Sequence, residues 1–193
     1  FTQGMLLNES FYREDAAGQV LDAGGPETLS YEDMMRQLAE VLGKRPRIIP
    51  VPVDDQGLNV DALERILAHE RPKFLYTMPT FQNPTGVSMT LERRRRLVQL
   101  CADHNVPVLE DDFDGELLYD GDNLPPLKGL PEGRDVIYTG TFSKMLFPGI
   151  RLGWVCAPAP VLTKIKLGKQ ATDLCTSSLA QFLVEAYFDE GRW

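Results

Sequence analysis

One short stretch of this 193-residue chain concentrates side chains that can bind an anion and react with a carbonyl group. The segment GTFSKMLFPGIRLGW, residues 140–154, places Lys144 just after the hydroxyl residues Thr141 and Ser143, and Arg151 follows in a Pro-Gly turn. A lysine amine can form a Schiff base with an aldehyde. Hydroxyl groups and a guanidinium suit a phosphate, because arginine can bind two oxygens at once. We therefore expect an aldehyde and a phosphate to be held together here.

Two further polar groups complete a single chemical pattern. Asn83 lies within NPTG, and Asp111 lies within EDDFD. An aspartate that faces a pyridine nitrogen keeps it protonated, which lets the ring accept electrons, and an asparagine amide can donate to a ring oxygen. Taken alone, NPTG fits an ordinary turn, paired acids fit a solvated loop, and a lone lysine fits a surface position. In combination with Lys144 the groups match one cofactor, pyridoxal 5′-phosphate.

These groups require a scaffold that gathers them, and the pattern along the chain predicts one. Apolar runs rich in strand-forming residues alternate with segments of helical periodicity, which favours an α/β fold with a mostly parallel sheet in three layers. The expected strands are 73–80, 106–112, 135–144 and 152–159, and the expected helices are a segment that Asn59 caps, 90–105, and two segments after 158. In such sheets ligands lie outside the carboxyl ends of the strands. Asn83, Asp111 and Lys144 each follow or end a different strand, so we expect them to meet.

Composition excludes several other classes of function. The formal charge is −8, which argues against a nucleic-acid surface, and we expect the arginine run at 93–96 to be a solvated helix face. The sequence contains no membrane-spanning apolar run and no signal peptide. Three scattered cysteines without a CxxC motif fit a reducing, cytoplasmic compartment. His69 and His104 lack the spacing of metal ligands, so we expect no metal site.

The motifs NPTG (83–86), LEDDFDGELLYDG (109–121) and GTFSKMLFPGIRLGW (140–154) together resemble those of the fold-type I, class I/II aminotransferases. The resemblance runs from about residue 51 to residue 193 and implies part of a large pyridoxal-phosphate-binding domain. It implies that Lys144 is the lysine of the Schiff base and that Asp111 is the partner of the pyridine nitrogen. It also implies that Asn83 donates to the ring 3-oxygen and that the phosphate ligands are Thr141, Ser143 and Arg151.

One position departs from the family pattern. The family usually has a tyrosine two or three residues after the aspartate, where it helps the asparagine to hold the ring oxygen. This sequence has Phe113 and Asp114 at those places. The side chain of phenylalanine cannot donate a hydrogen bond, so the pKa of the Schiff base and the reaction rate are not implied by the resemblance.

Two branches of the family remain as alternatives. The first contains enzymes of amino acid metabolism that transfer an amino group between an amino acid and a 2-oxo acid through a lysine Schiff base. Members of this branch are homodimers. The second is the aminotransferase-like effector domain of GntR-type regulators of the MocR group, whose EDDYD segment looks like the EDDFD segment here. That group carries a winged helix upstream. By this resemblance the chain is a fragment truncated before the C-terminal small domain, and it should have poor activity by itself.

Residues 1–50 have a different character. The segment DAGGPETLSYEDMMRQLAEVLGKRPRIIPVPV (22–53) resembles the C-terminal part of an NmrA-like atypical short-chain dehydrogenase, and its periodicity predicts a helix over 30–43. The chain can therefore be a chimera with a seam near residue 50, or an aminotransferase with a divergent N-terminal segment. The turn GGPE is not a dinucleotide-binding loop.

Overall fold

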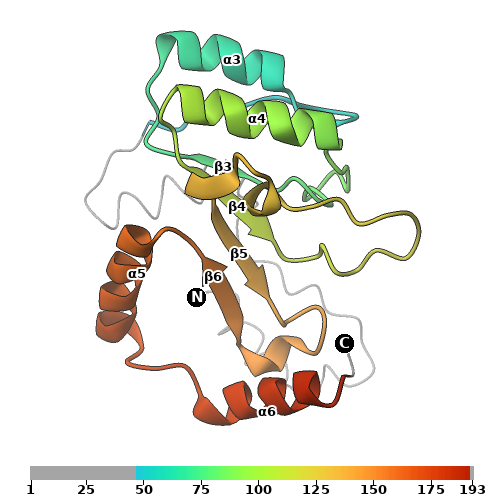
Figure 1. Cartoon of the computed structure of the whole chain (residues 1–193), viewed down its shortest axis with the longest axis vertical. Helices are drawn as coiled ribbons and strands as arrows, with labels where there is room; N and C mark the ends of the chain where they lie inside the picture. Colours follow the sequence, from blue (N-terminus) through green and yellow to red (C-terminus); the bar gives the residue numbers. More distant parts are fainter. Residues whose placement is uncertain (1–46, 192–193) are drawn as a thin grey trace, which may run out of the picture. The chain divides into compact units, whose positions relative to one another are not determined.

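The computed structural model describes residues 47–191 of the chain (Figure 1). The chain divides into two compact units, Phe1–Pro50 and Val51–Trp193. The helix expected over residues 30–43 lies outside the described residues. All the helices and strands described below belong to the second unit.

A four-stranded sheet with the strand order β3-β4-β5-β6 forms the centre of this unit. Its strands are β3 (Leu75–Thr77), β4 (Val108–Asp112), β5 (Ile137–Thr141) and β6 (Gly153–Cys156). The first three strands are parallel, and β6 is antiparallel to β5. The carboxyl ends of β3, β4 and β5 therefore lie at one edge of the sheet, as the sequence predicted.

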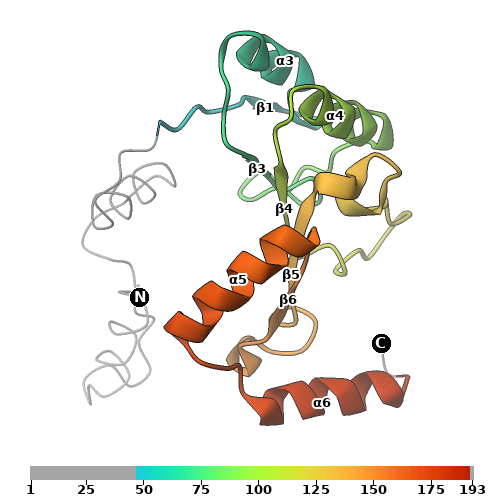
Figure 2. The same cartoon turned by 60° about the vertical axis from the view of Figure 1, so that its left-hand side comes forward.

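Helices α3 (Val60–His69) and α4 (Leu91–Asp103) lie side by side in both views of the molecule (Figures 1 and 2). Each helix presents an apolar stripe to one face of the sheet, where alternate strand residues such as Leu75 and Val108 are buried. A single core cluster joins these surfaces. Its buried residues are Leu58, Val60, Leu63, Leu67, Leu75, Met89, Leu97, Val98, Cys101, Val106, Val108, Leu127, Leu130 and Val136.

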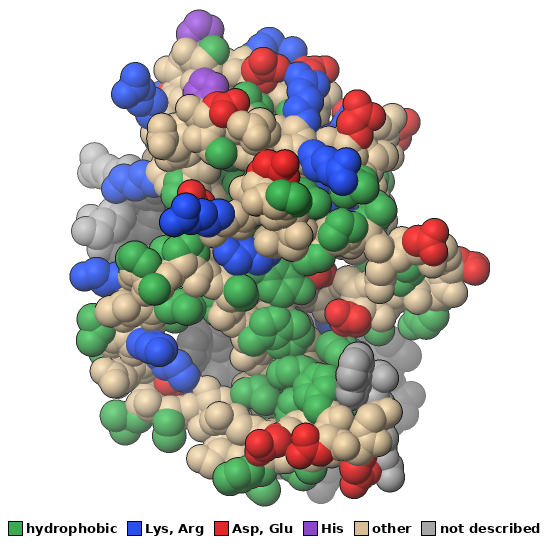
Figure 3. Space-filling view, in the orientation of Figure 1, with side chains coloured by type: hydrophobic (Ala, Val, Ile, Leu, Met, Phe, Trp, Pro, Cys, Tyr) green, Lys and Arg blue, Asp and Glu red, His purple; other side chains and the backbone are tan. Residues whose placement is uncertain are grey.

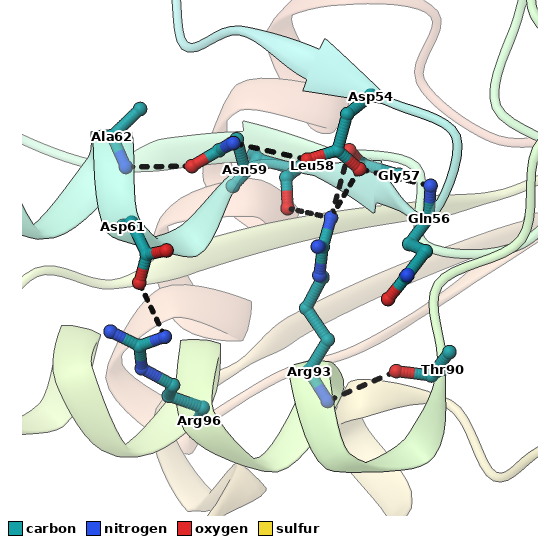
Figure 4. Close-up of polar contacts among 10 residues, drawn as sticks. All are labelled: Asp54, Gln56, Gly57, Leu58, Asn59, Asp61, Ala62, Thr90, Arg93 and Arg96. Carbon is teal, nitrogen blue, oxygen red and sulfur yellow. Dashed lines mark hydrogen bonds and ion pairs between the residues drawn. The ribbon is translucent and has the colours of Figure 1, made fainter.

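Side-chain caps fix the start of both helices. Asn59 caps α3 as predicted, because its Oδ1 atom accepts a hydrogen bond of 2.8 Å from the backbone N–H of Ala62 (Figure 4). Thr90 caps α4 in the same way through the N–H of Arg93. The two caps set the registers in which the apolar stripes meet the sheet.

The arginine run in α4 does not form one solvated face. Arg93 forms an ion pair with Asp54, and Arg96 forms one with Asp61 at the surface (Figure 4). Arg94, in contrast, is only 1% exposed. The prediction of a solvated face is therefore wrong at Arg94, because consecutive helix residues point in directions about 100° apart and one member of the run must face the sheet.

A second, smaller cluster involves the segment after β5. Helix α6 (Ser178–Asp189) packs Ala180 and Val184 around Ile150, with Phe142 and Phe188 beside them. Helix α5 (Ala159–Thr172) buries none of its side chains. The remaining elements are β1 (Val53–Asp54), β2 (Gly57–Leu58), η2 (Leu127–Gly129), η3 (Gly133–Asp135) and η4 (Pro148–Ile150). Within residues 47–191 no helix is long and apolar enough to cross a bilayer.

Candidate functional site

Asp111 lies near the end of β4, on the sheet face opposite α3 and α4. Strand residues alternate between faces, so Asp111 shares its face with Tyr76 on β3 and Thr139 on β5. The Tyr76 hydroxyl donates a hydrogen bond of 2.8 Å to Asp111 Oδ2, and Thr139 Oγ1 lies 3.5 Å from Asp111 Oδ1. The carboxylate is therefore oriented mainly by Tyr76, because the Thr139 hydroxyl donates its shorter hydrogen bond, of 3.1 Å, to the Glu110 carbonyl.

Asp112, the next residue, points to the other face and has a tyrosine of its own. The Tyr138 hydroxyl donates a hydrogen bond of 2.9 Å to Asp112 Oδ2. Burial, together with the negative charge of Asp112, raises the pKa of Tyr138 well above its usual range. Among the described residues, the buried Asp112 Oδ1 atom has no hydrogen-bond partner. The paired acids of the sequence thus have separate surroundings, and only Asp111 faces the side of Thr139 and Thr141.

The end of β5 and the turn after it form a polar hollow. Thr141 Oγ1 donates a hydrogen bond of 3.0 Å to Ser143 Oγ and accepts one of 3.1 Å from the Ser143 backbone N–H. A cavity of about 240 Å³ is lined by Thr141, Ser143, Arg151, Leu152 and Gly153. Two hydroxyl groups and one guanidinium therefore converge on a space large enough for a phosphate group.

Arg151 reaches this hollow from an unusual backbone position. It follows the 3-10 helix η4 and has a φ of 51°, in the left-handed region that non-glycine residues seldom occupy. Its guanidinium is exposed and donates a hydrogen bond of 3.3 Å to the Pro148 carbonyl. Such backbone strain of about 1–3 kcal/mol occurs most often at functional sites.

Lys144 is exposed and lies beside the segment that follows β4. Its Nζ atom is 5.9 Å from the centre of the Phe113 ring, within the range of a cation–π contact. The structure thus brings Lys144 to the same edge of the sheet as Asp111. The position at which the sequence departs from the family pattern is the one that contacts the lysine.

Asn83 lies on the loop between β3 and α4, and its side chain is exposed. Its backbone carbonyl accepts a hydrogen bond of 2.6 Å from Gln82 Nε2, and within residues 47–191 no hydrogen bond joins its side chain to Asp111 or Lys144. The loop is closed by the Gln82 N–H, which donates to the Val87 carbonyl at 2.9 Å. The structure therefore places Asn83 on the loop that follows β3, the strand next to β4.

Sequence reasoning missed Tyr76, Thr139 and Arg94 as residues that support the site. Strand alternation offered a signal for the first two, because a tyrosine and a threonine interrupt otherwise apolar strands on the face of Asp111. No pattern along the chain distinguished Arg94 from the arginines beside it.

The fold and the arrangement of this site define an α/β class of protein with a lysine just beyond a parallel strand and an aspartate on the neighbouring strand. Comparison with known families agrees with that description: the family aminotransferase class I and II matches residues 28–192. The chain belongs to this family. Its fold is accordingly the predicted α/β fold of the fold-type I aminotransferases.

Individual relatives give the same result. The 2-aminoadipate transaminase of Thermus thermophilus is 40% identical over 181 residues, which cover 92% of this chain and 46% of that protein. The structure is similar to that of the α-aminoadipate aminotransferase LysN from Thermus thermophilus, complexed with N-(5′-phosphopyridoxyl)-L-leucine. The TM-score is 0.73 with 42% identity, over 76% of this chain and 38% of the other.

Regulators are also among the relatives. The HTH-type transcriptional regulator YdeL of Bacillus subtilis is 33% identical over 173 residues, covering 86% of this chain and 35% of that protein. The chain thus spans less than half of the length of these curated relatives, 46% of the transaminase and 35% of the regulator.

The comparisons do not support the expected chimera. The aminotransferase family match begins at residue 28, and the Thermus relative aligns with 92% of the chain. The likeness to aminotransferases therefore extends well into residues 1–50. The short GGPE and IIPVPV segments that suggested an NmrA-like origin are too brief to outweigh an alignment of this length.

Proposed function

We propose that the full-length protein binds pyridoxal 5′-phosphate and transfers an amino group between an amino acid and a 2-oxo acid. The observation that carries the proposal is the position of Lys144. It directly follows Ser143, which lines the polar hollow together with Thr141 and Arg151, and it comes after β5, the strand that pairs with the strand of Asp111. The chain spans less than half of the length of these relatives, so the activity is proposed for the whole protein.

The residues of the site fit this cofactor in charge and in donor chemistry. Two hydroxyl groups and the guanidinium of Arg151 line a cavity of about 240 Å³, which suits a phosphate. Asp111 supplies a carboxylate that accepts a hydrogen bond of 2.8 Å from Tyr76. Lys144 supplies an exposed primary amine. The set therefore offers a separate group for each polar part of the molecule.

When bound, pyridoxal 5′-phosphate supplies an aldehyde that reacts with amines and a ring that accepts electrons. Asp111 would hold a proton at the ring nitrogen, with Tyr76 keeping its carboxylate in place. Thr141, Ser143 and Arg151 would bind the phosphate, and Asn83 would donate its amide N–H to the ring 3-oxygen. Lys144 would hold the aldehyde carbon through its amine, and, once the amine of the amino acid has replaced it there, the freed amine would take the proton from the Cα atom.

The contact between Lys144 and Phe113 bears on this proton transfer. An aromatic ring 5.9 Å from the amine attracts its charged form, whereas a phenylalanine offers no hydroxyl to the ring oxygen. In this protein the proposal therefore relies on Asn83 alone, of these two positions, to donate a hydrogen bond to the ring oxygen. The loss of its amide should be more harmful here than in a relative with a tyrosine as well.

A half-reaction tests the proposal directly. The full-length protein loaded with pyridoxal 5′-phosphate and mixed with an amino acid, without any acceptor, should release up to one equivalent of 2-oxo acid per site. The Lys144→Ala variant should release none. Absence of release from the wild-type protein with 2-aminoadipate, aromatic and branched amino acids would contradict the assignment as an aminotransferase.

A second candidate function is favoured by the regulators among the relatives. An effector-sensing domain would use the same residues to bind the cofactor and an amino acid without releasing a 2-oxo acid. The segment EDDFD, with Asp114 where enzymes of the family often have a tyrosine, resembles that group. Binding of an amino acid with no turnover, together with a winged helix encoded upstream, would favour this alternative.

The proposal includes several properties that rest on resemblance alone. Residues 51–193 are part of the large cofactor-binding domain, and the full-length protein is a cytoplasmic homodimer. Size measurement of the full-length protein in solution, with and without pyridoxal 5′-phosphate, tests the dimer.

A further inference from the structure

Arg94 is a buried cation in the middle of a run of surface arginines. Only 1% of its surface is exposed to solvent, whereas the next two residues, Arg95 and Arg96, are exposed. Burial of a charged group is strongly unfavourable unless the surroundings satisfy it with hydrogen bonds or an opposite charge. The contacts of Arg94 therefore indicate what its position stabilises.

The guanidinium of Arg94 donates hydrogen bonds to two different loops of the site. Nε donates to the Met89 carbonyl at 2.9 Å, and Nη2 donates to the Pro79 carbonyl at 3.0 Å and to Thr80 Oγ1 at 2.9 Å. Nη1 donates to the Pro125 carbonyl at 3.0 Å. The first three acceptors lie at the two ends of the loop that carries Asn83. The fourth lies near the end of the loop that joins β4, the strand of Asp111, to η2.

The loop from Pro79 to Met89 is closed at the point where Arg94 binds it. Met89 N–H donates to the Pro79 carbonyl at 2.7 Å, so this carbonyl accepts from both the loop and the guanidinium. Within the loop Phe81 has a φ of 47°, an unfavourable value for a bulky residue. Such a conformation persists only where the surroundings enforce it. The hydrogen bonds of Arg94 contribute to that enforcement.

A buried carboxylate secures the other loop beside Arg94. Glu110 is fully buried, and its two oxygens accept hydrogen bonds from the backbone N–H groups of Leu127, at 2.7 Å, and Lys128, at 2.9 Å. Burial raises the pKa of Glu110 above its ordinary value, and the two N–H groups and the charge of Arg94 offset only part of this increase. Burial lowers the pKa of Arg94, and the charges of Glu110 and Asp112 oppose that change. The two opposite charges thus fix the ends of both loops to α4 and β4.

We propose that Arg94 is a positioning residue of the cofactor site, which sets the distance between the Asn83 loop and the loop after Asp111. This inference rests on the proposed function, because it assigns Arg94 to the placement of Asn83 against the ring oxygen. Lysine cannot replace it, since one ammonium group cannot reach acceptors that a planar guanidinium spans with three nitrogens. A small displacement of a reacting or binding group can lower a rate by about a hundredfold.

The test compares Arg94→Lys with Arg95→Lys, which changes the adjacent, exposed arginine in the same way. The first measurement is hydrogen exchange of the full-length protein without cofactor. We expect amides of residues 80–89 to exchange at least about fivefold faster in Arg94→Lys, because hydrogen bonds to a charged group are lost. Arg95→Lys should leave them unchanged. Leu97→Ala, a core change on the same helix that leaves the hydrogen bonds of Arg94 in place, provides a control for general destabilisation.

The second measurement is the pH midpoint of the visible absorbance change of bound pyridoxal 5′-phosphate. Arg94→Lys should shift this midpoint in the same direction as Asn83→Ala. In the double variant Arg94→Lys should add no further shift, because its effect acts through Asn83. Leu97→Ala and Arg95→Lys should leave the midpoint at the wild-type value. If Arg94 only stabilised the fold, its replacement would not shift the pH midpoint in a way that disappears when Asn83 is already changed.

The outcomes separate the inference from the function on which it rests. If Asn83→Ala shifts the midpoint and Arg94→Lys does not, or if the two shifts add, the positioning role is overturned and the function stands. If Asn83→Ala shifts nothing, the role of Asn83 is overturned and the role of Arg94 with it. Should Arg94→Lys fail to fold, Thr80→Val removes a single acceptor and should give a smaller shift in the same direction. An unchanged midpoint in Thr80→Val would then overturn the proposal.

Discussion

Tyr76 and Tyr138 make equivalent contacts with two successive aspartates on opposite faces of the sheet. Each tyrosine is diagonal to its aspartate across parallel strands, at 2.8 Å to Asp111 and 2.9 Å to Asp112. A tyrosine hydroxyl can therefore be removed on the candidate cofactor face, at Tyr76, and separately on the opposite face, at Tyr138. This pair allows the role of Asp111 to be tested without a change in its charge.

We expect Tyr76→Phe to weaken binding of pyridoxal 5′-phosphate by roughly tenfold to a hundredfold. A hydrogen bond to a charged group contributes about 1.5–3 kcal/mol, and its loss leaves the Asp111 carboxylate less well oriented toward the ring nitrogen. Titration of the full-length protein with the cofactor, followed by absorbance, measures the change. Tyr138→Phe is the matched control and should have little effect. Equal losses of affinity in both variants would show that Asp111 has no special role.

Cys101 allows a prediction about pH. Its thiol is buried in the core, and burial raises its pKa to about 12, from an ordinary value of 9.0. The folded state therefore keeps a proton that the unfolded chain releases above about pH 9. The contribution of this group to stability is complete below pH 9 and is lost as the pH rises toward about 12.

Between these limits we expect the free energy of unfolding of the wild-type protein to fall by about 1.4 kcal/mol per pH unit on account of this thiol. Cys101→Ala should lack this part of the slope. Urea unfolding at pH 8 to 11 measures both proteins, and identical slopes would contradict the expected burial. The exposed Cys156 and Cys175 serve as internal controls, because they should react with a thiol reagent in the native protein while Cys101 does not.

The residues proposed to bind the cofactor can be proposed from the sequence, whereas the residues that contact and support them cannot. Lys144, Thr141, Ser143 and Arg151 are close in the chain, so a short segment suffices to recognise them. Tyr76 is 35 residues from Asp111, and Arg94 reaches acceptors as far as 31 residues away. Such contacts depend on strand register and loop path, which residue type alone does not specify.

Among the elements, β5 and β6 pack closely together at Gly140, next to the polar hollow. Gly140 on β5 is paired with Trp154 on β6, and the indole ring occupies the space that a side chain at 140 would need. The same indole lies 4.6 Å from the Phe142 ring, between centroids. The strand pair that ends at Thr141 therefore depends on a glycine.

We expect Gly140→Ala to lower the free energy of unfolding by about 1–3 kcal/mol, because the new methyl group displaces Trp154. Urea unfolding followed by tryptophan fluorescence measures it. Gly168→Ala in α5 provides the opposite case, since no atom lies within 4 Å of the added group. That variant should gain about 0.5–1 kcal/mol from helix propensity. A neutral Gly140→Ala would contradict the packing.

The elements themselves were predicted well where local patterns decide them. The Asn59 cap and the helical periodicity placed α3, and apolar runs placed β3, β4 and β5. The direction of β6 was not predictable, because its residues suit a parallel or an antiparallel strand equally. The buried Arg94 was mistaken for a surface residue, since a run of charges is usually solvated and its acceptors are backbone carbonyls.

For the molecule as a whole, the distribution of apolar side chains is uneven. In Figure 3 hydrophobic side chains gather over β6 and α6 in the lower half of the view, whereas charged side chains of both signs cover α3 and α4. Leu179 and Phe182 of α6 are 70% and 67% exposed, on the side of the helix away from Val184. Exposed apolar surface of this kind is typical of regions that contact other parts of a protein.

We expect residues 1–193, expressed alone, to bind the cofactor weakly and to turn over poorly. The relatives are more than twice as long, and the described site provides groups for the cofactor but no further arginine beside them for a substrate carboxylate. Steady-state turnover of this segment and of the full-length protein, at equal cofactor occupancy, gives the comparison. Equal turnover would show that these residues form a complete active site.

Lys144 is the residue proposed to bond to the cofactor, and this bond can be located chemically. Reduction of the full-length protein with borohydride in the presence of pyridoxal 5′-phosphate, followed by peptide mass spectrometry, locates the bond. We expect the added mass on the peptide that contains Lys144, and its loss in Lys144→Ala. Attachment to a different lysine, with Lys144 unmodified, would show that Lys144 is not the residue that bonds to the cofactor.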